Sequence, residues 1–258
     1  PIVFWVENTT PEEIVPAVIA GIENWNIAFK EAGFKNAIVA KIQPEDADWD
    51  AADYEYNVIR WSSEPDGGLL GIGPRVTNPL TGEIISADVV NKLLAVKVGR
   101  NYRKLYGYTE DNDPLMQYIT NLTLHEVGHV LGLRHNFRGS YLYSPKEIHN
   151  KEITGNTLMS SVMDYDPINV APEGTEQGIY FSTVPGVYDK WVIKFGYTPN
   201  LTEDERTAIL RESIKKELTF GTDDEAMSYP GNNIDPRTKR YDMSNDPITY
   251  AEDIVKIV

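Results

Sequence analysis

Three of the four histidines in this chain fall within one stretch of eleven residues, from His125 to His135. The stretch reads His-Glu-Val-Gly-His-Val-Leu-Gly-Leu-Arg-His, which fits the pattern H-E-x-x-H-x-x-G-x-x-H. With the composition of this chain, a chance match has a probability on the order of 10⁻⁵ or less. Histidines that only make structural hydrogen bonds along a helix are the alternative, and this low probability favours shared metal chemistry.

The spacing of the motif predicts its geometry. His125 and His129 are four residues apart, so a helix places them one turn apart on the same face. Both imidazoles can then bind one ion at zinc–nitrogen distances of roughly 2.0–2.1 Å. Gly132 tolerates a positive φ and lets the chain leave the helix, so that His135 approaches the ion from another direction. Three imidazoles leave one tetrahedral position open for water, which is typical of a catalytic Zn²⁺ site.

Glu126 is the expected catalytic residue. It lies about 100° around the helix from His125, beside the metal ligands and not among them. Zinc lowers the pKa of its water to about 7, and the carboxylate of Glu126 can take that proton as a general base. It can later hand the proton to a leaving amine. The residues therefore predict a zinc-dependent endopeptidase that hydrolyses peptide bonds.

The extended zinc motif resembles that of the metzincin metallopeptidases. Downstream, Ser161-Val162-Met163-Asp164-Tyr165 resembles their Met-turn, a tight turn beneath the three zinc histidines. The resemblance implies that Met163 supports the site from below. In some metzincins a tyrosine two residues after this methionine touches the zinc or stabilises the oxyanion, and Tyr165 matches that place. A buried structural tyrosine is the alternative for Tyr165.

The residue after the third histidine differs among metzincin families, and here it is Asn136. The segment His135-Asn136-Phe137-Arg138-Gly139 is similar to the pappalysin-like pattern His-x-Phe. The wider sequence, including residues 45–48 and 78–82, resembles a family of large bacterial zinc-dependent metalloproteases of the Bacteroidetes type. That likeness spans most of the 258 residues, whereas only residues 125–135 and 161–165 are highly specific.

Hydrophobic patterns and capping signals predict an α/β (α+β) fold. Strands are expected at residues 2–7, 36–43, 56–62 and 83–90, and helices at 10–33, 113–132, 184–195, 203–218 and after Pro247. Thr10 with Glu13, and Thr202 with Glu205, fit the capping-box pattern, and Asp113 before Pro114 fits an N-cap. Residues 136–185 are weakly patterned, and the tail 221–247 is polar and rich in turns.

The metzincin resemblance agrees with this pattern and implies a single catalytic domain. An upper subdomain of about residues 1–132 would hold a twisted mixed sheet and two long helices. A lower subdomain of about residues 133–258 would be irregular, with C-terminal helices. A cleft between the two would bind a protein or peptide substrate in an extended conformation. Residues 83–90 are the candidate edge strand that pairs its backbone with such a substrate.

Composition and hydropathy limit which other binding partners the chain can have and where in the cell it can act. With 24 Lys plus Arg against 39 Asp plus Glu, the net charge of −15 disfavours non-specific binding to nucleic acid. Cysteine is absent, which excludes a disulfide framework and a thiol nucleophile. No apolar run approaches 18 residues, so no membrane span is expected in this segment. Neither end looks natural, and we expect a segment of a longer, extracytoplasmic protein (periplasmic, cell-surface or secreted).

Two alternatives to an endopeptidase stay open on the sequence. One is a non-catalytic binding domain that retains zinc for folding alone, and the other is a zinc hydrolase that acts on a non-peptide amide. Among the remaining polar residues, His149 has polar neighbours and is expected at the surface. The aspartates, including Asp113, Asp164 and Asp223, lack the spacing of a calcium loop and are expected on solvated surface.

Overall fold

A computed structural model describes residues 1–64, 70–226 and 235–257 of the chain. The chain divides into two compact units. The first comprises Pro1–Asn26 and Asn36–Leu133, and the second comprises Ile27–Lys35 and Arg134–Val258. The division at Leu133 falls inside the histidine motif, between its second and third histidines.

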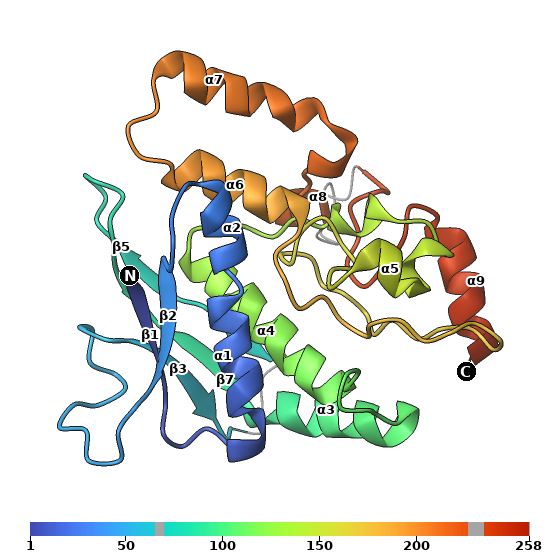
Figure 1. Cartoon of the computed structure of the whole chain (residues 1–258), viewed down its shortest axis with the longest axis horizontal. Coiled ribbons are helices and arrows are strands. Elements are labelled where there is room, and N and C mark those ends of the chain that lie inside the picture. The colour runs from blue at the N-terminus through green and yellow to red at the C-terminus, as the bar shows by residue number, and fades with distance from the viewer. Residues whose placement is uncertain (65–69, 227–234, 258) are drawn as a thin grey trace. The chain divides into compact units, whose positions relative to one another are not determined.

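A mixed sheet is the centre of the first unit (Figure 1). Its strand order is β2-β1-β3-β7-β4. The first four strands in this order run parallel, and β4 pairs with β7 in the antiparallel direction at one edge. This mixed sheet, together with several helices, confirms the predicted α/β fold class. The strands are β1 (Ile2–Val6), β2 (Ile38–Ile42), β3 (Asn57–Ser62), β4 (Gly71–Ile72) and β7 (Val89–Lys92).

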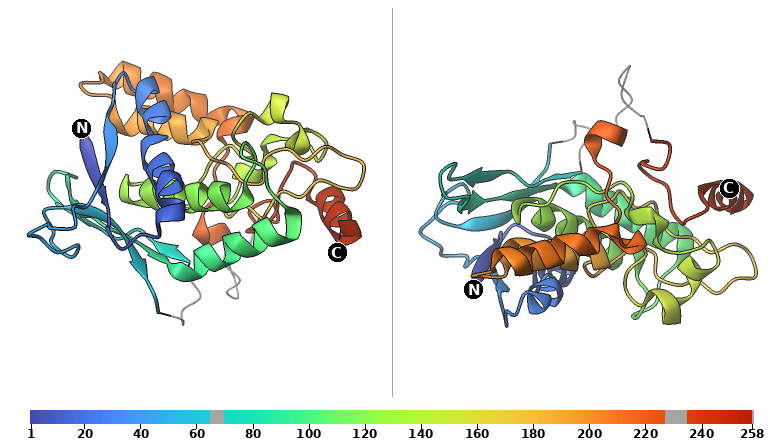
Figure 2. Two further views of the ribbon diagram at one scale, coloured as in Figure 1. Left: turned by 60° about the horizontal axis from the view of Figure 1, so that its bottom comes forward. Right: turned by 90° about the horizontal axis from the view of Figure 1, so that it is seen from above.

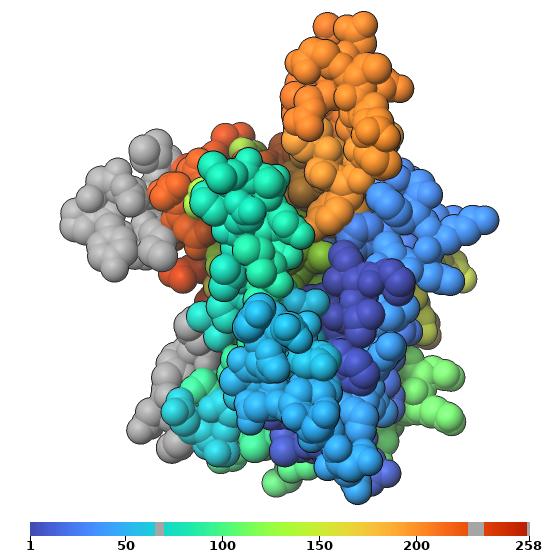
Figure 3. All heavy atoms as spheres, turned by 90° about the vertical axis from the view of Figure 1, so that its left-hand side faces the viewer, coloured from blue at the N-terminus to red at the C-terminus, as the bar shows by residue number. Residues whose placement is uncertain are grey.

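The stretch predicted as one edge strand over residues 83–90 is divided between two strands. Its first part is β6 (Ile84–Ala87), which pairs with β5 (Arg75–Thr77) in a separate two-stranded sheet. Its second part enters β7, which lies inside the large sheet between β3 and β4. The prediction of a single edge strand is therefore wrong. Of the two strands, β6 is an edge strand of its two-stranded sheet and β7 is an interior strand, because apolar alternation does not reveal how many neighbours a strand has. The β5–β6 hairpin and the loop after β2 both reach the face seen in Figure 3.

Three helices of the first unit pack together: α1 (Val15–Glu23), α3 (Leu93–Tyr106) and α4 (Pro114–Val130). Helix α4 contacts both of the others (Figure 1). A Cβ atom at Gly21 of α1 would lie only 2.5 Å from the Cβ of Thr123 in α4, so a glycine is required for this close crossing. The indole nitrogen of the buried Trp25 donates to the carbonyl of Leu124 at 3.0 Å. These contacts fix the position of α4 within the unit.

The first helical stretch differs from its prediction. The helix expected over residues 10–33 is interrupted, because α1 ends at Glu23 and α2 (Asn26–Glu31) follows. A 3₁₀ turn, η1 (Glu12–Ile14), precedes α1 with no side-chain cap, so the capping box of Thr10 and Glu13 is wrong. The hydroxyl of Thr10 is buried without a hydrogen-bond partner among the described residues. The amphipathic helix α3 was not predicted at all.

The second unit is largely irregular. Its main helices are α2, α6 (Val187–Tyr197), α7 (Glu203–Arg211) and α9 (Pro247–Ile257), and α6 and α7 lie side by side (Figure 2). The capping box of Thr202 and Glu205 is confirmed, but α7 ends seven residues before the predicted end and two 3₁₀ turns follow, η4 (Glu212–Ile214) and η5 (Lys216–Leu218). The remaining short elements are η2 (Gly139–Leu142), η3 (Glu147–His149), α5 (Lys151–Thr154) and α8 (Asp223–Ala226).

A small apolar core supports this irregular unit. Its buried members are Ile148, Leu158, Met159, Ile179, Met243 and Tyr250. They come from several loops and short helices, so packing between distant segments replaces regular secondary structure here. Part of the turn-rich tail predicted over residues 221–247, namely 227–234, lies outside the described residues. Within the described part of the chain, none of the helices is long and apolar enough to cross a membrane.

Candidate metal centre

Helix α4 is bounded by local signals that the sequence contains. Asp113 is its N-cap, with a side chain that accepts a hydrogen bond from the Leu115 nitrogen at 3.0 Å. At the other end, Gly132 has a φ of 105°, which favours glycine. The nitrogen of Leu133 then donates back to the carbonyl of Gly128 at 3.0 Å and closes the helix end. The helix predicted over residues 113–132 is confirmed to within two residues at its C-terminus.

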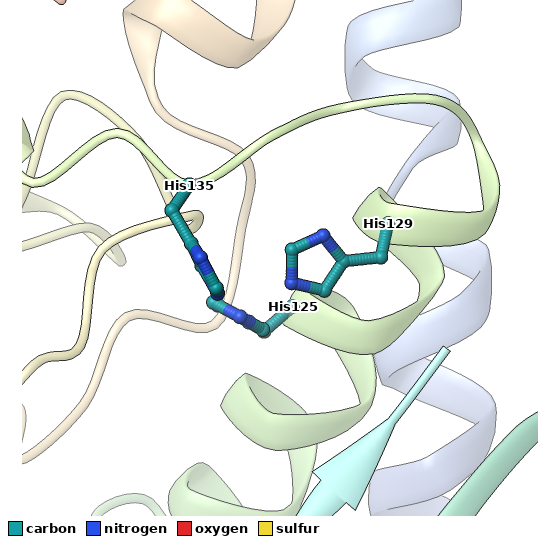
Figure 4. A group of neighbouring side chains, drawn as sticks. All are labelled: His125, His129 and His135. Atoms are coloured by element: carbon teal, nitrogen blue, oxygen red, sulfur yellow. The ribbon is translucent and has the colours of Figure 1, made fainter. Parts of the chain in front are cut away.

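The three histidines of the motif form one group. His125 and His129 project from α4, and His135 comes from the loop that follows it (Figure 4). One potential ligand atom from each ring lies within 4.8 Å of the others. The rings of His125 and His129 have centroids 4.8 Å apart and planes at 84°. The arrangement brings the three imidazoles close enough to share an ion.

Hydrogen bonds of two of the rings indicate which ring nitrogen carries the hydrogen and which can bind a metal. Nδ1 of His129 lies 3.1 Å from the carbonyl oxygen of Leu133, and a carbonyl can only accept. Nδ1 of His135 lies 2.9 Å from Oδ1 of Asp223. In both rings Nδ1 therefore carries the hydrogen, and Nε2 keeps its lone pair for a metal. An imidazole that carries its hydrogen on Nδ1 binds a metal through Nε2, and this arrangement fits Zn²⁺.

Burial and hydrogen bonding act on the pKa of Asp223 in opposite directions. Burial raises its pKa, whereas the hydrogen bonds that it accepts from His135 and Thr222 lower it. The net result is a pKa below the usual value for aspartate, so Asp223 is ionised at neutral pH. An ionised carboxylate is an acceptor only, which agrees with donation from Nδ1 of His135.

Glu126 lies against the edge of the sheet. Its side chain is buried, and burial raises its pKa to about 7. A Cβ atom placed on Gly71 of β4 would be 2.6 Å from Oε1 of Glu126 and 2.8 Å from Oδ1 of Asn91. A Cβ atom on Gly73 would be 2.6 Å from the Glu126 carbonyl oxygen. The absence of side chains at these two glycines is what allows the edge segment to approach α4.

The segment that resembles a Met-turn is held rigidly beside the third histidine. Met163 is fully buried, and its carbonyl accepts a hydrogen bond at 3.0 Å from the nitrogen of Asn136, the residue after His135. The buried Asp189 accepts from the Ser161 hydroxyl at 2.6 Å and from the Val162 nitrogen at 2.8 Å. These bonds connect the turn to both α6 and the segment that carries His135.

The ring of Tyr165 packs directly against the third histidine. Its centroid is 4.9 Å from that of His135, with the planes at 71°. Tyr165 also stacks on Tyr241, with ring centroids 5.6 Å apart and planes at 28°. The tyrosine is therefore next to His135, and its ring packs against both residues.

Several polar residues were misjudged by sequence reasoning. Asp164 is not on solvated surface: it is 1% exposed and accepts hydrogen bonds from the nitrogens of Ser140 and Tyr165. Asp223 is half-buried and contacts His135, whereas Asp113 is the N-cap of α4 as predicted. His149 is 8% exposed rather than at the surface, and it is outside the histidine group. Only the helix-cap position of Asp113 had a local signal, because the contacts of Asp164 with Ser140 and of Asp223 with His135 join residues 24 and 88 positions apart.

Comparison with known families adds an independent observation. A sequence model of the Met-zincin family matches residues 108–258, more than half of the chain. The chain belongs to the Met-zincin family. No curated protein and no solved structure matches it significantly. The Met-zincin match includes all of α4 and the second histidine-bearing segment, and it indicates a zinc metallopeptidase type of function.

Proposed function

We propose that this chain is a zinc-dependent endopeptidase. The observation that carries the proposal is the group of His125, His129 and His135, in which two rings have Nδ1 bonded to an acceptor. The three rings would bind the ion through their remaining nitrogens. Glu126 follows the first ligand on α4 and is buried beside the group, which suits a residue that handles a proton in the reaction.

The proposed chemistry divides between the metal and Glu126. Zinc held by three imidazoles supplies Lewis-acid chemistry, which polarises a carbonyl and makes water acidic near neutral pH. The carboxylate of Glu126 removes a proton from the attacking water, whose oxygen forms the new bond to the peptide carbon. The same residue then delivers that proton to the leaving nitrogen as the peptide bond breaks. Without a metal, burial raises the pKa of Glu126 to about 7, and a bound Zn²⁺ would lower it, which favours the carboxylate that accepts the proton.

Tyr165 and Met163 have supporting roles in this proposal. The ring of Tyr165 is packed against His135, and its hydroxyl would donate a hydrogen bond to the oxyanion that develops on the substrate. Met163 is fully buried in the turn that bonds to Asn136, and it would support the loop of the third ligand. The residues around Asn136 also support a closer relationship with pappalysin-like enzymes and with large bacterial metalloproteases of the Bacteroidetes type.

The substrate in this proposal is an extended peptide that pairs with β4. This strand is at the edge of the sheet, with β7 on its other side. Gly71 of this strand and the following Gly73 are in contact with α4 at Glu126, so a strand added to β4 would run close to the catalytic carboxylate. Backbone hydrogen bonds would then align the peptide without demanding a particular sequence.

The proposal is tested by metal-dependent proteolysis. We expect the zinc-loaded chain to cleave unfolded casein and a mixture of peptides, and a chelator such as 1,10-phenanthroline to stop cleavage. Added zinc should restore it, because the ion supplies the Lewis acid. Cleavage products are measured by mass spectrometry. Retention of zinc without cleavage of any substrate would support a binding domain instead, and release of product from non-peptide amides alone would support a different hydrolase.

Substitution of Gly71 tests the contact between β4 and the proposed base. In Gly71→Ala the new Cβ would meet Oε1 of Glu126 at 2.6 Å, so the carboxylate must move. We expect turnover to fall at least tenfold with zinc content unchanged, and the free energy of unfolding to fall by about 1–3 kcal/mol. Gly196→Ala is the matched control, because a Cβ there has nothing within 4 Å. Equal turnover in the two variants would contradict a role for this contact.

A further inference from the structure

The third histidine is not part of a helix, whereas the other two are. His125 and His129 project from α4, whose backbone fixes their positions. His135 follows the end of the helix and lies in a loop. Its ring could therefore adopt several orientations unless other groups restrain it. The position of the third metal ligand depends on what contacts this loop.

A segment almost ninety residues later provides that restraint. The side-chain nitrogen of Asn136 donates to the carbonyl of Thr219 at 3.1 Å, and its side-chain oxygen accepts from the nitrogen of Gly221 at 3.1 Å. The nitrogen of Phe137 donates to the carbonyl of Gly221 at 2.7 Å. Asn136 is fully buried, so these bonds are shielded from water. The segment 219–223 is thus bonded along the residues that follow His135.

Asp223 is the member of this segment that reaches the imidazole itself. Its Oδ1 is 2.9 Å from Nδ1 of His135, a separation of 88 residues in the chain. Its other oxygen, Oδ2, lies 3.3 Å from the hydroxyl of the neighbouring Thr222. Among the described residues, Asp224 makes an exposed ion pair with Arg134 at 3.6 Å and does not contact the histidine group. The two adjacent aspartates therefore have different environments, although the sequence presents them as equivalent.

We propose that Asp223 is a positioning residue for the third metal ligand. By accepting the hydrogen on Nδ1, it holds the ring of His135 in one tautomer and directs the lone pair of Nε2 toward the ion. Its negative charge also makes that nitrogen a stronger ligand. This inference rests on the metal binding in the proposed function, but it does not require that the substrate be a peptide.

Zinc affinity is the first test. The dissociation constant is measured by competition with a chromophoric chelator for the wild type and for Asp223→Ala, Asp223→Asn and Asp224→Ala. We expect Asp223→Ala to weaken zinc binding roughly 10–100-fold. Asp223→Asn should lose less, because its amide oxygen can still accept from Nδ1 but carries no charge. Asp224→Ala should equal the wild type, because exposed ion pairs contribute little.

The tautomer of His135 is the second test, and it needs neither metal nor substrate. ¹⁵N NMR of the metal-free protein should find the hydrogen on Nδ1 in the wild type and in Asp224→Ala. In Asp223→Ala it should move to Nε2 in a large fraction of molecules, whereas a merely structural role of Asp223 would leave the tautomer unchanged. If the alanine variant does not fold, the asparagine variant still gives the zinc affinity, and Asp223→Leu, which is of similar size but has no acceptor, gives the tautomer.

The two tests separate failure of this inference from failure of the proposed function. Equal zinc affinity in Asp223→Ala and the wild type, with the same tautomer of His135, would overturn the positioning role alone. A wild-type chain that binds no zinc in the competition assay would overturn the proposed metal site and the inference with it. A zinc-binding wild type that cleaves no peptide would leave the positioning role of Asp223 intact.

Discussion

Glu126→Gln is expected to retain zinc and to lose peptide hydrolysis. Glutamine has nearly the same shape as glutamate, but its amide cannot take a proton from water. General acid–base catalysis contributes on the order of 10²–10⁴-fold to the rate of such reactions. We therefore expect kcat to fall by at least about 10²-fold. Because burial already raises the pKa of Glu126 to about 7, a neutral side chain at this position adds no desolvation penalty. The variant should therefore fold normally.

The measurement is turnover of a cleavable peptide, with zinc content determined by elemental analysis on the same sample. Glu205→Gln is a suitable control, because Glu205 accepts a hydrogen bond from the Thr202 nitrogen at the start of α7 and takes no part in the histidine group. Undiminished turnover in Glu126→Gln would remove this residue from the mechanism. A loss of zinc together with turnover would instead indicate that Glu126 acts in metal binding.

His135→Ala is expected to remove most of the bound zinc. The substitution takes away one of the three imidazoles whose potential ligand atoms lie within 4.8 Å of one another. Loss of a direct ligand should exceed the roughly 10–100-fold decrease in affinity that is typical of residues that only support a ligand. Zinc content after buffer exchange, measured by elemental analysis, should fall well below one ion per chain.

His149→Ala is the matched control for this experiment. It removes the remaining histidine of the chain, which is outside the group that the structure brings together. Because His149 is largely buried, its variant is first checked for folding by circular dichroism. Zinc should stay bound in this control. Unchanged zinc content in His135→Ala would refute ligation by three histidines.

The prediction of α4 succeeded because every signal involved is local. The N-cap at Asp113, the apolar side and the stop at Gly132 all act over a few residues, and the structure has each of them. The prediction at Thr10 failed although its pattern was equally clear. There the helical stretch begins with the 3₁₀ turn η1, and the hydroxyl of Thr10 is buried. Tertiary packing therefore overrides the local capping preference.

The strand at the edge of the sheet, β4, could not be predicted from the sequence for a different reason. Strand β4 has only two residues, Gly71 and Ile72, which is too short for any alternation to be recognised. Its position beside β7 is decided by pairing in three dimensions. Conversely, residues 83–90 had a clear strand pattern, but the pattern contained no information about the division into β6 and β7.

The sequence by itself determined the helix that carries two histidines, the point where that helix ends, and the kind of ion that three imidazoles prefer. These depend on the spacing of neighbouring residues and on the chemistry of their side chains, which any conformation of the chain preserves. Only the tertiary structure decided that Gly71 lies against Glu126 and that Asp223 bonds to His135. Such pairs are far apart along the chain, and they meet only because packing of the whole unit fixes their positions.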